Sequence, residues 1–367
     1  MKKILYIVSA LSKCGPTNQL LNIIKNLDEK AFYAEVLTLS PEPNSSMIDE
    51  FELKGIKVHS LGLSRLAGFF YAKKLVNRFI ENFSPDVIHT QGYRADLISS
   101  TLVVDSKRVC TIRNFPQIDF KMEYGSIVGN LMAFRHFRAM SSIDSIVGVS
   151  KPVVDNIKKN TKTKNLLVIE NGVDTERFKS VPSSESLLLR TELGLKERDV
   201  VFLSSGGLIE RKDPEFLVRF FKKQPDNYHL LLVGDGELKS KLHSLASGKK
   251  NIHIVGAVND VNLYLNVADY YISASRAEGL PNAVMEAMAT GLPVILSDIG
   301  PHCEVVKYGT DCASLFELDN EESLQSSVDA TLEADYVSAS HSSLAIVNDF
   351  LNAKNMSLKY QELYQIK

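Results

Sequence analysis

Two glutamates eight residues apart, Glu278 and Glu286, bracket a short turn that opens a predicted helix. A helix start directs backbone N–H groups and the positive end of the helix dipole toward one point, where a diphosphate can bind. Carboxylates on either side can accept hydrogen bonds from sugar hydroxyls. The pattern predicts a nucleotide-sugar site, and its turn consists of Gly279, Leu280, Pro281 and Asn282.

The residues around this pair distinguish it from a chance spacing. An apolar run at 270–274 predicts a buried strand before Glu278, and apolar residues recur at helical spacing from 283 to 288. Gly291 then suits the left-handed position that ends many helices. The alternative is a plain strand–turn–helix with two solvated glutamates, which this context disfavours.

Two adjacent cations, Arg211 and Lys212, follow the glycine pair 206–207 at the end of another predicted strand. They could neutralise the charge of a departing diphosphate, although an exposed Arg-Lys pair is more often solvated surface. A second glycine motif at 234–236 lacks the third glycine of a dinucleotide fingerprint. Hydride transfer is therefore poorly supported.

Metal-ligand patterns are absent from the sequence. No two aspartates lie two positions apart, and neither the eight histidines nor the four cysteines show ligand spacing. We therefore expect no metal and no cofactor, and the leaving charge would be met by Arg211, Lys212 and helix N-termini. The cysteines are typical of reduced thiols in the cytosol.

Strand and helix patterns alternate along all 367 residues, which indicates an α/β fold with parallel sheets. We expect two doubly wound, Rossmann-like units that face each other across a cleft, with a linker in the polar stretch from 171 to about 186. The predicted domains are 1–178, which binds the acceptor, and 179–345, which binds the nucleotide sugar. A long final helix, 346–367 within a helical pattern from 342, is expected to pack back on the first domain. Strands are predicted at 4–9, 34–39, 56–60, 86–90, 108–112, 145–149, 199–205, 228–233, 252–255, 269–274, 293–297 and 313–316.

Charge is divided unevenly between the two halves. Residues 1–180 hold 25 Lys and Arg against 18 Asp and Glu, whereas residues 181–367 hold 17 against 26. The basic half could attract an anionic membrane face. Segments 66–83 and 124–140 combine apolar and basic residues, so they are either interfacial helices or, more commonly, helices that face the core. No apolar run is long enough to span a membrane, and the apolar N-terminus fits a first strand better than a signal peptide.

The chain resembles the retaining glycosyltransferases of family four, which have the GT-B fold. The resemblance rests mainly on EGLPNAVMEAMATGLPVI (278–295), with PDVIHT (85–90), SIVGVSKPV (145–153), VIENGVDTERF (168–178), LLLVGDGEL (230–238) and IHIVGAVNDV (252–261). It implies that Glu278 binds the donor sugar near its reacting carbon, that Glu286 binds the ribose, and that Lys212 binds the diphosphate.

The resemblance also assigns several further residues. Backbone amides from Gly279 to Asn282 would hold the sugar and diphosphate, and Gly15 would belong to a glycine loop of the first domain. Gly207 stands where the family usually has an arginine, so Arg211 is expected to compensate. Arg113 stands where many members have a cleft histidine, and it is expected to contact sugar or phosphate.

The function implied by the resemblance is metal-independent transfer of a monosaccharide, with retention, from a nucleotide-diphosphate sugar to a glycan or lipid-linked acceptor. A UDP-sugar donor and cell-surface polysaccharide synthesis, in the cytoplasm or at the inner face of the cell membrane, are expected. The alternatives are a catalytically silent GT-B subunit that activates a partner, a nucleotide-sugar epimerase and a phosphate-using relative. A nucleic-acid partner is not expected, because the basic excess is diffuse.

Overall fold

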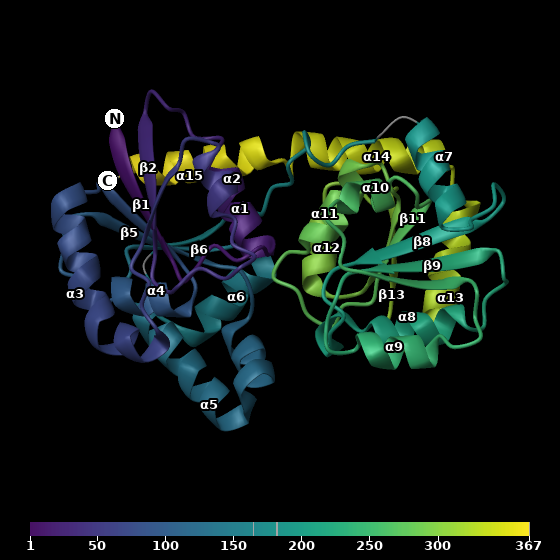
Figure 1. Cartoon of the computed structure of the whole chain (residues 1–367), viewed down its shortest axis with the longest axis horizontal. Helices are drawn as coiled ribbons and strands as arrows, with labels where there is room; N and C mark the ends of the chain where they lie inside the picture. The colour runs from purple at the N-terminus through teal and green to yellow at the C-terminus, as the bar shows by residue number, and fades with distance from the viewer. Residues whose placement is uncertain (164, 181–182, 367) are drawn as a thin grey trace. The chain divides into compact units, whose positions relative to one another are not determined.

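Short apolar runs alternating with amphipathic segments form two separate parallel sheets in this computed structural model, which describes residues 1–163, 165–180 and 183–366. The first unit contains Met1–Gly172 and Ala353–Lys367, and the second contains Val173–Asn352. Figure 1 shows helices on both faces of each sheet. This arrangement explains why the central strands are apolar along their whole length: residues 4 to 7 are fully buried, for example.

The first unit has a seven-stranded parallel sheet with the order β3-β2-β1-β4-β5-β6-β7. Its strands are β1 (Lys2–Val8), β2 (Phe32–Thr38), β3 (Lys57–Ser60), β4 (Val87–Gln91), β5 (Lys107–Ile112), β6 (Ser145–Gly148) and β7 (Leu166–Val168). Its helices are α1 (Gly15–Ile24), α2 (Ile48–Glu52), α3 (Arg65–Phe83), α4 (Tyr93–Ser99), α5 (Pro116–Met140), α6 (Lys151–Asn160) and α15 (Ala353–Gln365). All six strands predicted here are present, and β7 was not predicted.

The second unit has a six-stranded parallel sheet with the order β10-β9-β8-β11-β12-β13. Its strands are β8 (Val200–Ser205), β9 (Tyr228–Val233), β10 (Ile252–Gly256), β11 (Tyr270–Ser273), β12 (Val294–Ser297) and β13 (Ala313–Phe316). Its helices are α7 (Ser183–Glu192), η1 (Glu210–Lys212, 3-10), α8 (Pro214–Phe221), α9 (Lys239–Leu245), α10 (Val261–Leu265), α11 (Asn282–Ala289), α12 (Gly300–Val306), α13 (Glu321–Glu333) and α14 (Tyr336–Asp349). The predicted fold of two doubly wound α/β units is confirmed.

Both sheets reverse their direction of growth at one point. In the first unit β1 lies between β2 and β4, and in the second unit β8 lies between β9 and β11. Loops diverge from the carboxyl ends of the strands at such a point and leave a crevice, which is where open α/β sheets bind ligands. The topology therefore fixes one place in each unit for a site.

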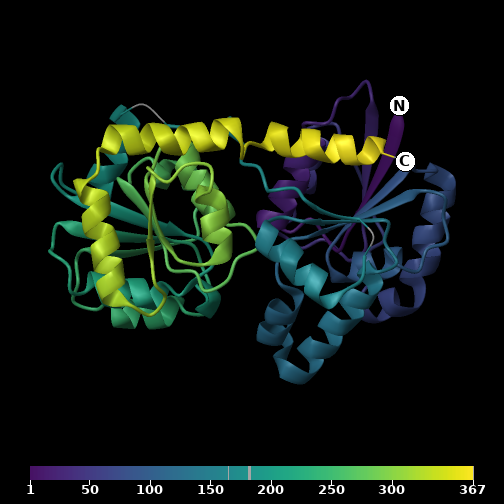
Figure 2. The ribbon, with the colours of Figure 1, turned by 180° about the vertical axis from the view of Figure 1, so that it is seen from behind.

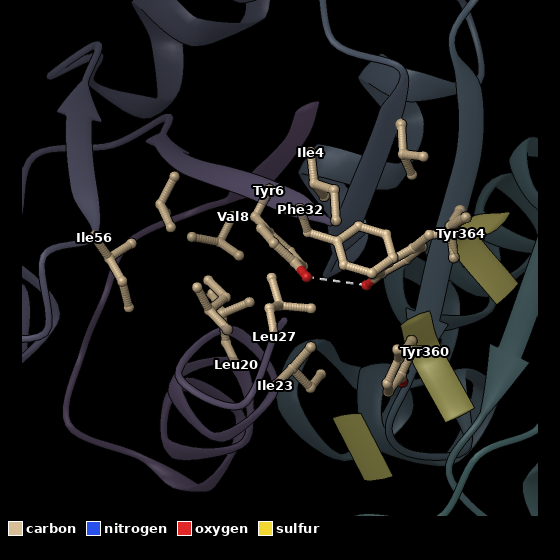
Figure 3. Close-up of a cluster of buried hydrophobic side chains, with 14 of the residues drawn as sticks. Ile4, Tyr6, Val8, Leu20, Ile23, Leu27, Phe32, Ile56, Tyr360 and Tyr364 are labelled. Atoms are coloured by element: carbon tan, nitrogen blue, oxygen red, sulfur yellow. Dashed lines mark hydrogen bonds between the residues drawn. The ribbon is translucent and has the colours of Figure 1, made fainter. Parts of the chain in front are cut away.

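The C-terminal helix completes the core of the first unit. Tyr360 and Tyr364 of α15 are buried with Ile4, Tyr6 and Phe32 of the sheet, as Figure 3 shows. The hydroxyls of Tyr6 and Tyr364 lie 3.1 Å apart, and the Tyr364 hydroxyl also lies 2.7 Å from Nδ1 of His89. Burial lowers the pKa of His89 to about 3, so this histidine is neutral in the core.

The prediction of a single long terminal helix is wrong. Two helices, α14 and α15, are separated at residues 350–352, and Figure 2 shows the interruption in the yellow ribbon. The break lies where the chain leaves the second unit, between Asn352 and Ala353, and Phe350 has a non-helical φ of −122°. The chain passes from the first unit to the second between residues 172 and 173, and it returns between residues 352 and 353. The expected boundaries were 178/179 and 345/346. Residues 181–182 of the expected linker lie outside the described residues.

None of the helices described for this chain combines the length and the apolar character that crossing a bilayer requires.

Candidate functional site in the second unit

The charged motifs of the second half converge at the point where its sheet reverses. Strands β8 and β11 pair in parallel, with Tyr270 opposite Phe202. The chain after β8 runs through residues 206–212, and the chain after β11 runs through residues 274–282. Because both strands end at the same edge, the Arg-Lys pair and the first glutamate are brought together although 66 positions separate Lys212 from Glu278.

Glu278 forms an ion pair with each of the two cations. Its Oε1 accepts a hydrogen bond of 2.5 Å from Nζ of Lys212, and its Oε2 accepts one of 3.1 Å from Arg211. The glutamate is 6% exposed. Burial alone would raise the pKa of this carboxyl, but Lys212 and Arg211 outweigh burial and lower it to about 2. Glu278 is therefore ionised throughout the physiological range.

Arg211 also joins the two loops through the backbone. Its guanidinium donates a 2.6 Å hydrogen bond to the carbonyl oxygen of Ala277, and its own carbonyl accepts one of 2.8 Å from the N–H of Arg276. The side chain thus fixes the position of Glu278, in addition to any contact with a diphosphate that the sequence predicted for it. That predicted contact stays a prediction.

Arg276, which sequence reasoning did not select, holds the other side of the same loop. It pairs with Asp213, with 2.7 Å between nitrogen and oxygen, and also with Asp319. The hydrogen bonds that it donates to Asp319 and Asp213 raise its pKa above the ordinary value. Asp213 adopts a positive φ of 45° and caps α8 by accepting a hydrogen bond from the N–H of Phe216. The one available sequence signal was a third cation two positions before Glu278.

The second glutamate of the motif lies in the second turn of α11. This helix begins at Asn282 after Pro281, which provides no side-chain cap, and Gly291 follows its end with a φ of +86°, as predicted. Burial raises the pKa of Glu286 to about 7, although Arg177 and Lys212 act in the opposite direction. Gly279, Leu280 and Pro281 are buried in the turn between the two glutamates. The two carboxyls of the motif therefore differ in charge state near neutral pH.

His302 is a further buried group beside this site that the sequence did not indicate. Its Nδ1 lies 2.8 Å from the carbonyl oxygen of Ser297, so Nδ1 carries the proton and Nε2 is an acceptor. Burial lowers its pKa to about 4, against an opposing effect of Glu278. No partner for Nε2 is present among the described residues. The imidazole is therefore neutral at physiological pH.

Glycines allow the loops after β8 and β9 to touch. A Cβ on Gly234, whose φ is +147°, would lie 1.8 Å from the carbonyl oxygen of Gly206. At Gly206 itself the stem of Lys212 passes within 3.7 Å of the Cβ position. Gly234 thus permits the approach of two backbones. A Cβ on Gly206 would only be in ordinary contact with the lysine, and its φ of +132° is what favours glycine there.

The two remaining predicted residues, Gly15 and Arg113, belong to the first unit. Gly15 is the first residue of α1 and follows Cys14, which is the N-cap residue of this helix. Arg113 follows β5 and donates hydrogen bonds to the side-chain oxygens of Gln91 (3.0 Å) and Asn171 (2.7 Å). Burial lowers its pKa.

A cavity of about 340 Å³ lies at the carboxyl ends of β1, β4 and β5 in this first unit, and Arg113 forms part of its wall. Tyr93 and Phe120 add aromatic rings, and His136 lines it while its Nε2 lies 2.8 Å from Asp96. This hollow lies where the sheet of the first unit reverses, whereas the ion pairs of Glu278 occupy the corresponding point of the second. Within the ranges 1–163, 165–180 and 183–366, no three His, Cys, Asp or Glu side chains are grouped as metal ligands.

Comparison with known proteins assigns both halves to sugar-transfer families. Residues 15–177 match the family model described as "Glycosyltransferase Family 4", and residues 197–334 match "Glycosyl transferases group 1". The O-antigen biosynthesis glycosyltransferase WclY of Escherichia coli is 25% identical over 99% of this chain and 98% of its own length. An Escherichia coli UDP-Gal:alpha-D-GlcNAc-diphosphoundecaprenol alpha-1,3-galactosyltransferase is 35% identical over 38% of each chain.

Two solved structures share the fold over nearly the whole chain. HepE of Anabaena, solved in complex with UDP, superposes with a TM-score of 0.82 at 18% identity and 99% coverage of both chains. Sucrose-phosphate synthase of Thermosynechococcus elongatus gives a TM-score of 0.84 at 17% identity, covering 100% of this chain and 98% of its own.

Proposed function

Because the chain belongs to the family-four glycosyltransferases of the GT-B fold, we propose that it transfers a monosaccharide from a nucleotide-diphosphate sugar with retention of configuration and without a metal ion. The observation that carries the proposal is the pairing of Lys212 and Arg211 with the buried Glu278 at the carboxyl end of β8 and β11. Two cations and one carboxylate leave a net positive charge beside a sugar-hydroxyl acceptor.

The cations supply what the departing diphosphate needs. As the bond between the anomeric carbon and the phosphate oxygen breaks, negative charge accumulates on that oxygen. Lys212 and Arg211 are already positioned by Glu278, so they stabilise this charge with little rearrangement. One fixed guanidinium and one lysine ammonium perform the electrostatic task that a divalent ion performs elsewhere.

Glu278 is suited to hold the donor sugar rather than to form a bond with it. A carboxylate with a pKa of about 2, engaged by two cations, is a weak nucleophile but remains an acceptor for sugar hydroxyls. The acceptor oxygen then bonds to the anomeric carbon on the face that the diphosphate leaves. Its proton passes to the leaving phosphate oxygen, and a nucleoside diphosphate is released. The protein contributes positioning and charge stabilisation.

Donor and acceptor follow from the relatives. The Escherichia coli galactosyltransferase is named for a UDP-sugar and a lipid diphosphate acceptor, and HepE was solved with UDP. We therefore infer a UDP-sugar donor and a glycan or lipid-linked acceptor of surface-polysaccharide synthesis. The acceptor is assigned to the first unit, in whose cavity Arg113 and two aromatic rings can contact a sugar. Glu286 and the 279–282 turn are assigned to the ribose and the diphosphate.

A cytoplasmic place of action, at the inner face of the cell membrane, is proposed on two grounds. All four cysteines are free, which suits a reducing compartment. The basic excess of residues 1–180 suits a nearby anionic surface.

Turnover of purified full-length protein tests the proposal. A panel of nucleotide sugars would be assayed for nucleoside diphosphate release, with and without acceptor, in the presence of a chelator. We expect acceptor-dependent release that the chelator leaves unchanged, and a product with the donor's anomeric configuration by NMR. Lys212→Ala should lower kcat by at least about a hundredfold, whereas Lys223→Ala, a lysine of the same unit that pairs with Glu321 on the surface, should leave it unchanged.

Abolition of turnover by the chelator, or an inverted product, would contradict the proposed mechanism. Affinity for nucleotide sugar without any turnover would instead favour a catalytically silent subunit. Release of a modified nucleotide sugar without acceptor would point to an epimerase.

A further inference from the structure

Large apolar side chains lie uncovered along the first turns of α3. Leu66 is 74% exposed, Phe69 77% and Phe70 66%, and the two phenylalanine rings touch edge to face. The opposite side of the same helix is buried through small or branched residues, namely Gly68, Ala72, Val76 and Ile80. The helix therefore already has its core-facing side, and its phenylalanines are directed to solvent.

Helix α5 repeats this arrangement as a folded pair of segments. Gly125 has a φ of +76° and reverses the chain, and a Cβ on Gly129 would lie 2.4 Å from the carbonyl oxygen of Phe120. The two segments of α5 therefore pack backbone against backbone, and Figures 1 and 2 show α5 projecting from the lower end of the first unit. On the second segment Ile127 is 88% exposed, Leu131 59% and Phe134 63%.

The exposed residues of α5 share one side of the helix. Ile127, Leu131 and Phe134 recur at intervals of four and three residues, and Arg138 continues the same row. The buried row of the segment contains Ala133, Phe137 and Met140. The sequence left two interpretations open for these helices, core-facing or interfacial. The structure shows a core-facing side on each helix and leaves the apolar residues of the other side exposed to solvent. We call Leu66, Phe69, Phe70, Ile127, Leu131 and Phe134 the apolar face.

Basic side chains flank the apolar face. Residues 65–78 contain four Lys or Arg, and residues 126–140 contain two, while neither segment has an Asp or Glu. All six of these cations are exposed, namely Arg65, Lys73, Lys74, Arg78, Arg135 and Arg138. Arg65 at the start of α3 acts electrostatically on Tyr124 of α5, where it lowers the pKa against the larger effects of Glu123 and burial that raise it.

A groove beside the second segment of α5 adds to the basic residues that border the apolar face. Its volume is about 460 Å³, and Phe134, Arg138 and Lys162 contribute to its wall. An apolar rim next to two cations matches the junction of an acyl chain with an anionic headgroup.

We propose that the apolar face docks the first unit on an anionic lipid bilayer, with the phenylalanines in the acyl boundary and the flanking cations at the headgroups. Helices that lie in a membrane interface have this combination of an apolar side and a basic border. A second copy of the chain is a poorer occupant, because a two-fold interface would place the cations of one copy against those of the other. The proposal goes beyond the transfer reaction and does not depend on the donor assignment.

Vesicle co-sedimentation of the full-length protein at low salt tests the docking. Vesicles of phosphatidylcholine with about 30% phosphatidylglycerol represent the anionic surface, and pure phosphatidylcholine is the neutral comparison. We expect the wild type to partition at least about tenfold better to the anionic vesicles, with the preference reduced by high salt. The variants Phe69→Ser/Phe70→Ser and Ile127→Ser/Leu131→Ser should each lose about tenfold in partitioning.

A matched control separates this surface from apolar exposure in general. Leu187 and Leu188 on α7 of the second unit are 60% and 66% exposed, and Leu187→Ser/Leu188→Ser should bind vesicles as the wild type does. All variants should keep the wild-type melting temperature, since the replaced side chains are exposed. Absence of vesicle binding by the wild type, equal loss in the control, or a wild-type dimer that the Phe69→Ser/Phe70→Ser variant abolishes would overturn the proposal. None of these results would alter acceptor-dependent turnover in detergent, which tests the transferase separately.

Discussion

At the scale of single residues, the two glutamates of the Glu-x7-Glu motif are in opposite electrostatic states. Lys212 and Arg211 neutralise Glu278 and lower its pKa to about 2, whereas burial raises the pKa of Glu286 to about 7. The carboxylate that we propose to orient the donor sugar is thus paired with two cations. For Glu286, which we propose to bind the ribose hydroxyls, burial outweighs the opposing effects of Arg177 and Lys212.

Glu286 makes stability depend on pH in a direction unusual for an acid. Its pKa in the folded protein is about 7, against an ordinary value of 4.5, so between these values the native state holds a proton that the unfolded state has lost. The contribution of Glu286 to the free energy of unfolding therefore falls as pH rises from about 4.5 to 7, and levels off once pH exceeds the pKa of the folded state. We predict that Glu286→Gln removes this decrease. The melting temperature of the ligand-free variant should therefore exceed that of the wild type by more at pH 8 than at pH 5. Parallel wild-type and variant curves across that range, measured by calorimetry, would refute it.

At the scale of elements, the sequence predicted which segments form strands but not every detail of their ends. All twelve predicted strands exist, because continuous apolar runs between turn residues are a strong signal for buried parallel strands. Strand β7, with three residues, is too short to give such a signal. The break between α14 and α15 was missed because apolar spacing continues across it, and the cause is the passage of the chain from one unit to the other.

The site itself was predictable in part. Strand ends and glycine turns placed Arg211, Lys212 and Glu278 at the edge of one sheet. Their direct pairing was not predicted, because side-chain partners depend on loop conformations that no local pattern records. Arg276 was missed for the same reason, because its partner Asp319 lies 43 positions away in the sequence. His302 was missed because no local pattern records its burial beside Glu278.

The glycine contact between the loops after β8 and β9 gives a test at this scale. Gly234→Ala would place a Cβ 1.8 Å from the carbonyl oxygen of Gly206 and would force an alanine into a φ of +147°. We predict a loss of at least about 3 kcal/mol in the free energy of unfolding. Gly248→Ala is the control, since its φ is +79° but no atom lies within 4 Å of the added Cβ, and it should cost about 1 kcal/mol. Equal costs in urea denaturation would show that the contact is unimportant.

At the scale of the whole molecule, the first unit is built from both ends of the chain. Met1–Gly172 supplies the sheet, and α15 returns after the entire second unit to cover it with Met356, Tyr360, Leu363 and Tyr364. Stability of the first unit therefore depends on residues more than 300 positions from β1, as the pairing of Tyr6 with Tyr364 illustrates. The sequence indicated a terminal helix that contains these tyrosines. The partners of Tyr364, which are Tyr6 and His89, are seen only in the structure.

The hydroxyl of Tyr364 tests this long-range closure. Tyr364→Phe would leave the hydroxyl of Tyr6 and Nδ1 of His89 without their shared buried partner. We predict a loss of about 1–3 kcal/mol in the free energy of unfolding with little change in donor binding. Tyr336→Phe, at a partly exposed tyrosine of the second unit, should change stability by less than about 0.5 kcal/mol. An equal effect of both substitutions by chemical denaturation would contradict the role given to α15.

The measurement that most directly tests the central claim is calorimetric titration of UDP into the full-length protein in excess chelator. The claim is that Lys212 and Arg211, held by Glu278, receive the diphosphate without a divalent ion. The account predicts binding that the chelator does not weaken, that Lys212→Ala reduces at least about tenfold, and that Lys223→Ala leaves unchanged. Binding that appears only when Mg²⁺ or Mn²⁺ is added, or that survives Lys212→Ala at full strength, would contradict it.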